Sequence, residues 1–236
     1  MVYKYVIFKD DDVGKNFDKL KKWIDVVVRN DAKGTIGLIG KYLNDSELKD
    51  YLNSLNPNII EIFCHGYSHS FYPFLVNRIF RGKRIIPAEF EKNLERHNNS
   101  LIKYRELEKK YLDKKALAFG PPGNIWNENV ADALIQNDFK MIFAWKKVKA
   151  DILTIPLSDN LNQNSFGDFN NDYEKNKDNL IYTLQFHHAK LSENQFNLME
   201  EVIDFLKNKE KRIFVTPTEL FNISKKDKDV LNQMSL

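Results

Sequence analysis

The chain has 236 residues, of which 42% are hydrophobic and 13% aromatic, so it can bury a substantial core within one large α/β domain. Its formal net charge of +3 is too mild to indicate nucleic-acid binding, which usually appears as a concentrated basic stripe. No apolar run approaches the ~18 residues of a membrane span, and the first residues lack the basic start and cleavage site of a secretory signal. Cys64 is the only cysteine, which excludes an internal disulfide and suits a reducing compartment. We therefore expect a cytoplasmic protein with no membrane span and no nucleic-acid partner.

The predicted elements alternate between strand and helix along most of the chain. Short apolar runs rich in Val, Ile and aromatic residues predict strands over 2–9, 35–39, 59–64, 117–119, 140–145, 152–155, 180–186 and 212–215. Apolar residues at helical spacing predict helices over 17–27, 88–112, 128–137 and 193–207. A further short helix is predicted to follow a cap at Asp45 or Ser46. We expect a polar loop over 158–179, and a charged, frayed tail over 225–236 that follows a single catalytic domain over 1–224.

Three of the predicted strands end in residues that could carry chemistry. The alternation of strands and helices predicts a mainly parallel sheet covered by helices. In such architectures, sites form where strands end and loops begin. The strand ends in question are occupied by Asp10 to Asp12, by His65 and by His187. We therefore expect these side chains to meet at one edge of the sheet.

Two histidines with a four-residue spacing follow the predicted strand over 59–64. In a helical turn, positions i and i+4 lie on one face, so the rings of His65 and His69 can reach one ion. Catalytic zinc often takes three nitrogen or oxygen ligands, and a carboxylate from Asp10 to Asp12 would complete that set. A cation would also relieve the repulsion among these adjacent carboxylates. Alternatively, the histidine spacing is accidental and the acidic triplet is a solvated turn or the cap region of a helix.

Four segments occur in an order and at separations that match the motifs of one enzyme family. They are the runs Phe8 to Gly14, His65 to His69, Phe119 to Asn124 and Leu184 to His187. In these runs the chain resembles the NodB-type polysaccharide deacetylases, the fourth carbohydrate esterase family. The resemblance covers nearly the whole chain. It implies a distorted (β/α) barrel of about seven strands.

The resemblance also implies a role for each residue of the site. Asp12, His65 and His69 would hold one divalent metal ion, zinc by default, although such a ligand set also accepts Fe(II), Co(II) or Ni(II). Asp11 would be the general base that takes the proton of the attacking water. His187 would be the general acid for the departing amine.

Two alternatives to these assignments stay open on the sequence alone. The acidic pair of the first motif could be Asp10 and Asp11 instead of Asp11 and Asp12. The general acid could be His188, which is adjacent to His187.

The third motif departs from the family pattern. Gly120 stands where the family has an arginine that orients the catalytic aspartate, and Gly123 stands where it has an aromatic residue. Gly123 still has an N–H group to offer, so Gly123 and Asn124 are the candidate oxyanion or substrate-binding residues. In the register shifted by one residue, Pro122 would occupy that place and would have no N–H. The substitute for the arginine is expected in a basic loop over 78–84 or in backbone donors near Asn124. The run Gly120 to Gly123 could equally be only a tight turn.

A few further residues have competing interpretations. We expect Cys64 to be a core residue, His97 a surface residue and Trp145 a core residue, while Trp126 could either pack in the core or stack on a sugar. A basic group after the histidine pair is either a solvated loop or a clamp for an anionic group of the substrate; it consists of Arg78, Arg81, Lys83 and Arg84.

The function implied by the resemblance is the metal-dependent removal of an acetyl group from an N-acetylated sugar or glycan intermediate. Two alternatives remain. The first is a hydrolase of the same fold that acts on another amide. The second is a non-catalytic carbohydrate-binding relative that keeps the metal as a structural element, and the missing arginine favours this second alternative.

Overall fold

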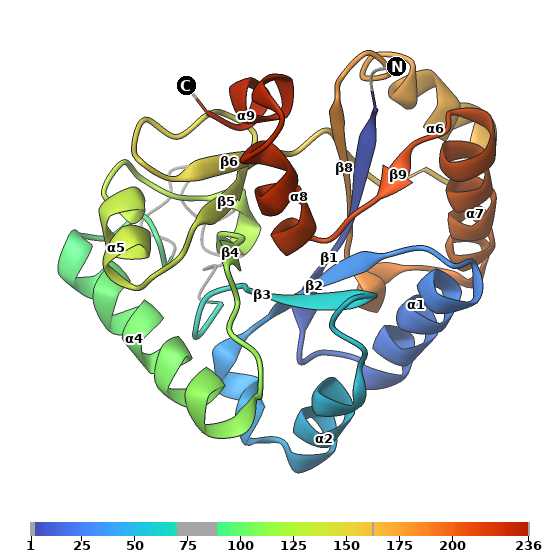
Figure 1. Cartoon of the computed structure of the whole chain (residues 1–236). Coiled ribbons are helices and arrows are strands. Elements are labelled where there is room, and N and C mark those ends of the chain that lie inside the picture. Colours follow the sequence, from blue (N-terminus) through green and yellow to red (C-terminus); the bar gives the residue numbers. More distant parts are fainter. Residues whose placement is uncertain (1–2, 70–88, 162, 236) are drawn as a thin grey trace, which may run out of the picture.

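The computed structural model describes residues 3–69, 89–161 and 163–235. Within these ranges, strands form the centre of the molecule and helices surround them (Figure 1). The strands are β1 (Tyr5–Val13), β2 (Gly34–Leu38), β3 (Ile60–Cys64), β4 (Ala118–Phe119), β5 (Met141–Ala144), β6 (Leu153–Pro156), β7 (Asp159–Asn160), β8 (Ile181–Phe186) and β9 (Ile213–Phe214). The helices are α1 (Phe17–Arg29), α2 (Ser46–Ser54), α4 (Leu94–Tyr111), α5 (Val130–Gln136), α6 (Phe166–Tyr173), α7 (Glu193–Asp204), α8 (Pro217–Ser224) and α9 (Lys228–Met234).

The strands form one parallel sheet that curls into a distorted barrel. Its main path runs β6-β5-β4-β3-β2-β1-β8-β7, and β9 pairs with β1. The chain passes directly from β6 to β7, which lie at the two ends of that path: the N–H of Leu157 donates to the carbonyl of Ala144 on β5, and the N–H of Ser158 donates to Thr183 on β8. The predicted barrel is therefore confirmed. The described sheet has nine strands where about seven were expected, partly because β7 is a two-residue strand inside a segment that we predicted to be a loop.

The alternation of side chains along β1 separates two hydrophobic cores. Tyr5 and Ile7 point into the barrel, where they pack with residues of β3, β5 and β8. Val6 and Phe8 point outward and pack under the surrounding helices. Continuing this alternation places Lys9 and Asp11 on the inner side and Asp10 on the outer side. The pattern therefore places Lys9 and Asp11 inside the barrel, near the C-terminal end of β1.

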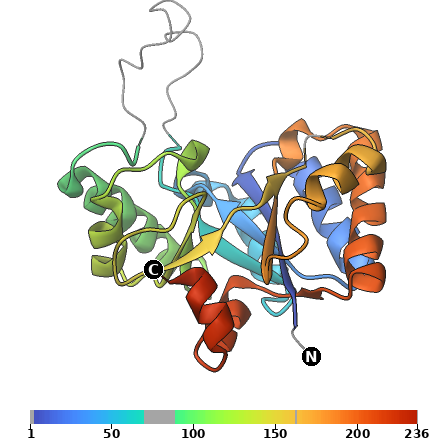
Figure 2. The ribbon, with the colours of Figure 1, turned by 90° about the horizontal axis from the view of Figure 1, so that it is seen from above.

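Helices α8 and α9 lie at the same end of the barrel as the N-terminus (Figure 2). Val230 and Met234 of α9 belong to the inner core, together with Tyr5 and Ile181 at the starts of β1 and β8. The Gln233 side chain accepts a hydrogen bond from the N–H of Ile181 at 2.9 Å. The expectation of a frayed tail over 225–236 was therefore wrong, because two apolar residues four positions apart give this charged segment one buried face.

Three other expectations need correction. Helix α4 begins at Leu94, not at residue 88, because the Asn93 side chain caps it by accepting a hydrogen bond from the N–H of Arg96. The segment predicted as a polar loop contains α6, which Ser165 caps in the same way. His97 is completely buried beside the Phe90 ring, not on the surface.

The positions of two tryptophans can also be compared with the sequence analysis, which expected Trp145 in the core and left Trp126 open. Trp145, expected in the core, is 48% exposed. Trp126 is partly buried and packs against the outer core.

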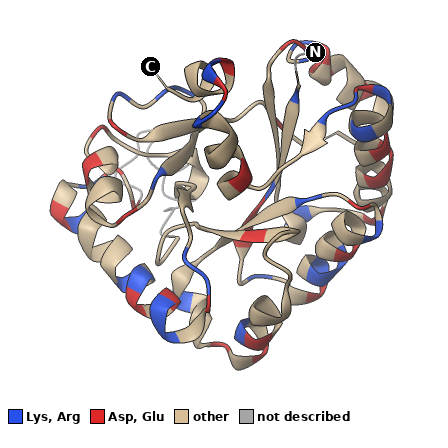
Figure 3. Ribbon diagram, in the orientation of Figure 1, with Lys and Arg blue, Asp and Glu red and all other residues tan. Residues whose placement is uncertain are grey.

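Charged residues of both signs alternate along the outer helices and do not gather by sign (Figure 3). Among the described helices, none has both the length and the hydrophobicity that crossing a membrane requires. Asp45 caps α2 as predicted, and Asn16 caps α1. The surface thus has the mixed charge that is usual for the exposed faces of amphipathic helices.

The buried face of α9 leads to a stability test. Met234→Ala should lower the free energy of unfolding by about 2–5 kcal/mol, as for other buried methionines. Asn232→Ala on the exposed side of the same helix should change it by less than about 0.5 kcal/mol. Urea denaturation of both variants measures the difference. Equal, small effects would show that α9 does not pack against the barrel in solution.

Candidate metal centre

An irregularity at the end of β1 turns two consecutive aspartates toward one place. The pairing of β1 with β2 shifts between Asp10 and Val13, and Asp12 has a positive φ of 68°. In a regular strand Asp11 and Asp12 would point to opposite faces. A bulge with a left-handed residue re-aims a side chain, which is why bulges are frequent beside active sites. Here it brings Asp12 to the same side as Asp11.

His65 and His69 meet through a loop and not through a helical turn. His65 follows β3 directly, Gly66 has a φ of 75° and His69 a φ of 49°. Their ring centroids lie 5.0 Å apart. The spacing therefore brought the rings together as predicted, but by a different geometry, because two left-handed residues reverse the chain within five positions.

The loop between the two histidines is held by a buried carboxylate. Glu89 accepts hydrogen bonds from the N–H of Tyr67 at 2.8 Å and from the N–H of Ser68 at 3.2 Å. It also accepts from the hydroxyl group of Ser100 on α4. A Cβ atom added at Gly66 would lie 2.9 Å from Glu89, so a side chain at that position would disturb the support. Glu89 thus ties the histidine loop to the helix layer.

Asp12, His65 and His69 bring potential ligand atoms within 4.8 Å of one another. The Nε2 atoms of His69 and His65 lie 2.7 Å and 3.7 Å from Asp12 Oδ1. That buried oxygen has no hydrogen-bond partner among the described residues. The Nδ1 of His65 lies 2.7 Å from the carbonyl of Gly120, which can only accept, so Nδ1 carries the proton and Nε2 presents its lone pair to the cluster. Two imidazoles and a carboxylate of this kind fit a divalent metal ion.

A cavity of about 390 Å³ lies beside Asp11, the residue that precedes Asp12 in the chain, and the three cluster residues are not part of its lining. Asp11, His187, Gly123 and Asn124 all line it. The structure therefore brings the proposed base, the proposed acid and the two candidate oxyanion residues to one cavity. Asp11 also approaches the cluster itself, with its Oδ1 3.8 Å from the Nδ1 of His65.

Asp11 is paired with a lysine that the sequence analysis did not single out. The Nζ of Lys9 lies 2.5 Å from Oδ1 of Asp11 and 2.9 Å from Oε1 of Gln185, and Lys9 is completely buried. Burial raises the pKa of Asp11, but the Lys9 ammonium and the neighbouring His65 lower it, and the net shift is downward. Asp11 is therefore a carboxylate at neutral pH. A lysine at the end of an apolar run, two positions before Asp11 and therefore on the same face of the strand, was the signal that could have revealed this pair.

His187 and His188 point in different directions. His187 lines the cavity, and its pKa is lowered because burial outweighs the effects of Asp11 and Asp12. His188 is completely buried, with Nδ1 2.5 Å from Oδ2 of Asp10 and Nε2 2.6 Å from the carbonyl of Lys15. Both partners can only accept, so both ring nitrogens of His188 carry protons. Burial lowers the pKa of His188, but the Asp10 carboxylate more than compensates and the net shift is upward.

The pairing of His188 with Asp10 bears on the two alternatives that the sequence left open. Asp10 also accepts a hydrogen bond from the N–H of His188 at 2.8 Å, so both of its oxygens are occupied on the outer side of the sheet. Asp10 and His188 thus form a structural ion pair away from the cavity. The geometry favours Asp11 with Asp12 as the acidic pair and His187 as the residue that faces a substrate.

The third-motif loop forms a left-handed turn at the edge of the cavity. Gly123 has a φ of 64° and Asn124 a φ of 56°. The N–H of Asn124 donates to the carbonyl of Pro121 at 2.9 Å, so this donor closes the turn and does not orient Asp11. The basic residues Arg78, Arg81, Lys83 and Arg84, considered as another source of that orientation, lie outside the described residues. Cys64 is buried as expected, and burial raises the pKa of its thiol.

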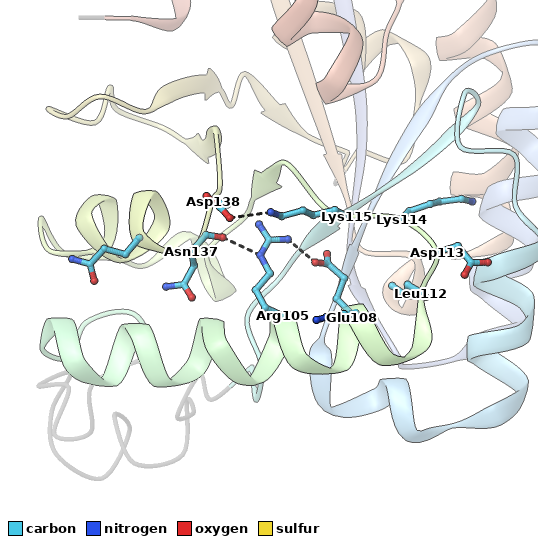
Figure 4. Close-up of a pocket in the computed structure, with 10 residues that line it drawn as sticks. Arg105, Glu108, Leu112, Asp113, Lys114, Lys115, Asn137 and Asp138 are labelled. Carbon is cyan, nitrogen blue, oxygen red and sulfur yellow. Dashed lines mark hydrogen bonds and ion pairs between the residues drawn. The ribbon is translucent and has the colours of Figure 1, made fainter.

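A larger cavity, of about 480 Å³, lies near the opposite ends of the strands (Figure 4). Its lining comes from α4 and from the segments that precede β4 and β5. The charged groups there are bonded to their neighbours: Arg105 to Glu108 at 2.6 Å and to the carbonyl of Asn137 at 3.0 Å, and Lys115 to Asp138 at 3.1 Å. These contacts explain the charges as internal pairs, so the cavity beside Asp11 remains the better candidate site.

Comparison with known proteins gives a family that the motifs did not indicate. The model of glycosyl hydrolase family 57 matches residues 6–224. The chain belongs to glycosyl hydrolase family 57. The resemblance to NodB-type deacetylases therefore lies in the fold and not in the family. No curated protein matches this family 57 chain.

Solved structures of family 4 carbohydrate esterases share the fold of this family 57 chain. A candidate polysaccharide deacetylase from Mycobacterium smegmatis matches with a TM-score of 0.70 at 11% identity, over 97% of this chain and 92% of that one. A family 4 acetyl xylan esterase from Clostridium thermocellum, in complex with a cobalt ion, matches with a TM-score of 0.64 at 16% identity, over 94% and 92%. A family 4 pseudoenzyme from Bacillus anthracis matches with a TM-score of 0.56 at 14% identity, over 89% of this chain and 63% of that one. This chain therefore spans less than two thirds of the pseudoenzyme.

The cluster leads to a test of metal binding. Asp12→Ala, His65→Ala and His69→Ala should each weaken zinc binding by more than the ~10–100-fold that loss of a supporting residue costs, because each removes a ligand. Calorimetric titration with zinc, with metal content checked by elemental analysis, measures the effect. His187→Ala is the matched control and should bind zinc like the unaltered protein. Undiminished zinc binding in all three ligand variants would rule the cluster out as the metal site.

Proposed function

We propose that the protein is a metal-dependent hydrolase that removes the acetyl group from an N-acetylated sugar or glycan intermediate. The observation that carries this proposal is the position of the Asp12, His65 and His69 cluster beside a cavity lined by Asp11 and His187. The cluster suits a divalent metal, with zinc as the default. A carboxylate and an imidazole at the same cavity are the groups that general base and general acid catalysis need.

Each residue of the cavity has a separate role in the proposed reaction. When bound, the metal ion supplies Lewis-acid polarisation of the acetamide carbonyl and of the attacking water. Asp11 is ionised and takes a proton from that water. His187 gives a proton to the departing amine. Burial lowers the pKa of His187, so it must take up that proton within the site, and the proton that Asp11 removes from the water is the available source. The turn at Gly123 and Asn124 borders the place where the acyl oxygen would lie.

Glycoside hydrolysis is the second candidate, because the family model bears that name. A glycosidase of the usual kind needs two carboxyl groups, one of which must be protonated to act as the acid. At this site Asp10 pairs with a doubly protonated His188 and Asp11 pairs with Lys9. Asp12 lies against two imidazoles. Despite burial, the pKa values of Asp11 and Asp12 are lowered by Lys9 and by the two imidazoles, and Asp10 points away from the cavity, so the geometry supports amide hydrolysis better.

A non-catalytic role is suggested by the family 4 pseudoenzymes among the structures of the same fold. Asp11 and His187, which a purely structural metal site would not need, support catalysis instead. The single buried cysteine suits a reducing compartment, so we propose a cytoplasmic glycan intermediate as the substrate.

Asp11→Asn tests the assignment of the general base. The amide can still fit beside Lys9 but cannot take a proton, so turnover should fall by ~10²–10⁴-fold while the metal stays bound. Acetate release from N-acetylated sugars and elemental analysis of the purified variant measure the two properties. If Asp11→Asn lost the metal and Asp10→Asn lost only turnover, the two aspartates would have the opposite roles.

His187→Ala and His188→Ala form a matched pair of neighbouring substitutions. His187→Ala should lower turnover by ~10²–10⁴-fold without loss of metal, because it removes the group that protonates the amine. His188→Ala should leave turnover per folded molecule much closer to normal but lower the thermal stability, because it leaves Asp10 buried without its partner. Assays corrected for the folded fraction separate the effects. A larger turnover loss in His188→Ala would overturn the assignment.

A further inference from the structure

We propose that Lys9 is the positioning residue of Asp11 and holds its carboxylate from inside the barrel. This inference rests on the proposed function, because it concerns the residue assigned as general base. Three sets of contacts support it: those of the Lys9 ammonium, those of its aliphatic chain, and those around Gly120.

The ammonium group of Lys9 connects two strands at the wall of the cavity. Its Nζ lies 2.5 Å from Oδ1 of Asp11, which is two positions further along β1 and therefore on the same face. It also donates to Oε1 of Gln185 at 2.9 Å, and Gln185 is the register partner of Lys9 on β8. Asp11 and Gln185 both line the cavity. Lys9 thus holds the Asp11 carboxylate from the interior of the barrel, on the side away from a substrate.

Two aromatic rings confine the Lys9 side chain. Its Nζ lies 5.0 Å from the ring centre of Phe63 and 5.2 Å from that of Phe143, close enough for both ring faces to attract the cation. Because Lys9 is completely buried, its ammonium has little freedom to leave Asp11. A cation held in this way can fix a carboxylate more firmly than a solvated lysine could.

The surroundings of Gly120 leave little room for a side chain at that position, so the cation beside Asp11 comes from Lys9 on β1. A Cβ atom at Gly120 would lie 2.6 Å from the Phe63 ring and 3.5 Å from Cε of Lys9. An arginine at this position would therefore have to enter space that Phe63 and Lys9 already fill. On another side, a Cβ atom at Gly37 would lie 3.2 Å from Oδ1 of Asp11. The space beside Asp11 is therefore shared by Lys9 and by two glycines, Gly37 and Gly120.

The contacts also indicate which oxygen of Asp11 can react. Lys9 and His65 both approach Oδ1, at 2.5 Å and 3.8 Å. We therefore infer that Oδ2 faces the cavity and receives the proton. A displaced carboxylate would no longer be aimed at the water, and misplacement of about 1 Å can cost about 10²-fold in rate.

The experiment compares Lys9→Met in two backgrounds, the unaltered protein and Asp11→Asn. Zinc occupancy, thermal unfolding, KM and kcat for acetate release are measured for each protein. If Lys9 acts by aiming Asp11, Lys9→Met should lower kcat about 10²-fold with KM and zinc occupancy unchanged. In the Asp11→Asn background it should cause no further loss. Lys115→Met, which breaks an ion pair with Asp138 far from the cavity, is the matched control and should leave kcat unchanged.

Several results would overturn the proposal. Unchanged kcat per folded molecule in Lys9→Met would assign Lys9 a role in stability alone. An equal loss of kcat in both backgrounds would show that Lys9 does not act through Asp11. If Lys9→Met fails to fold, the Lys9→Met/Asp11→Asn protein, in which no unpaired carboxylate remains, still allows the comparison with Asp11→Asn.

A crystallographic readout keeps this proposal separate from the proposed function. If the unaltered protein released no acetate, the proposed function would fail, but the position of the Asp11 carboxylate could still be measured. Crystal structures of the unaltered protein and Lys9→Met should differ in the orientation of that carboxylate. An Asp11 side chain in the same position in both would contradict the positioning role whatever the activity.

Discussion

The bulge at the end of β1 is the constraint on which the rest of the site depends. A regular strand would send the side chains of Asp11 and Asp12 to opposite faces, and only one of them could then face the cavity. The left-handed residue at position 12 removes this restriction, at the cost of the strain that a non-glycine residue has in that conformation. Asp12 then reaches the two histidines that follow β3, while Asp11 keeps the inward direction that it shares with Lys9. One strand end thus supplies the proposed base, its proposed anchor and a candidate metal ligand.

The sequence predicted the parts of this arrangement that depend on local pattern. The strand ends, two of the helix caps and the approach of His65 and His69 to an acidic strand end follow from alternation, caps and spacing, whereas the choice of Asp12 came from the resemblance to the deacetylases. It could not predict contacts between distant segments, such as the pairing of Asp10 with His188 or of Lys9 with Gln185, because these depend on the register of β1 and β8. The buried side of α9 was missed because the charged residues of the segment 225–236 outnumber the two that pack. Trp145 and His97 were misplaced because a single residue has too little pattern to indicate its burial.

Family and fold give different indications of function. Membership of glycosyl hydrolase family 57 would by its name suggest a reaction at a glycosidic bond. The barrel is shared with family 4 carbohydrate esterases, at identities of 11–16% for the three compared above, which shows a common fold and no more. A barrel of this type hosts many reactions, so the site residues must decide. Here, despite burial, Lys9 and two imidazoles lower the pKa of Asp11 and Asp12, and on that ground we propose attack on an amide in preference to protonation of a glycosidic oxygen.

The identity of the bond that is broken tests the account most directly. The purified protein, loaded with zinc or stripped with a chelator, would be incubated with N-acetylated oligosaccharides, and the products analysed by mass spectrometry. The account predicts that only the zinc-loaded protein acts, and that each product has lost acetyl groups while its number of sugar units is unchanged. Shorter oligosaccharides with all acetyl groups in place, formed equally well without the metal, would contradict it and would support glycoside hydrolysis instead.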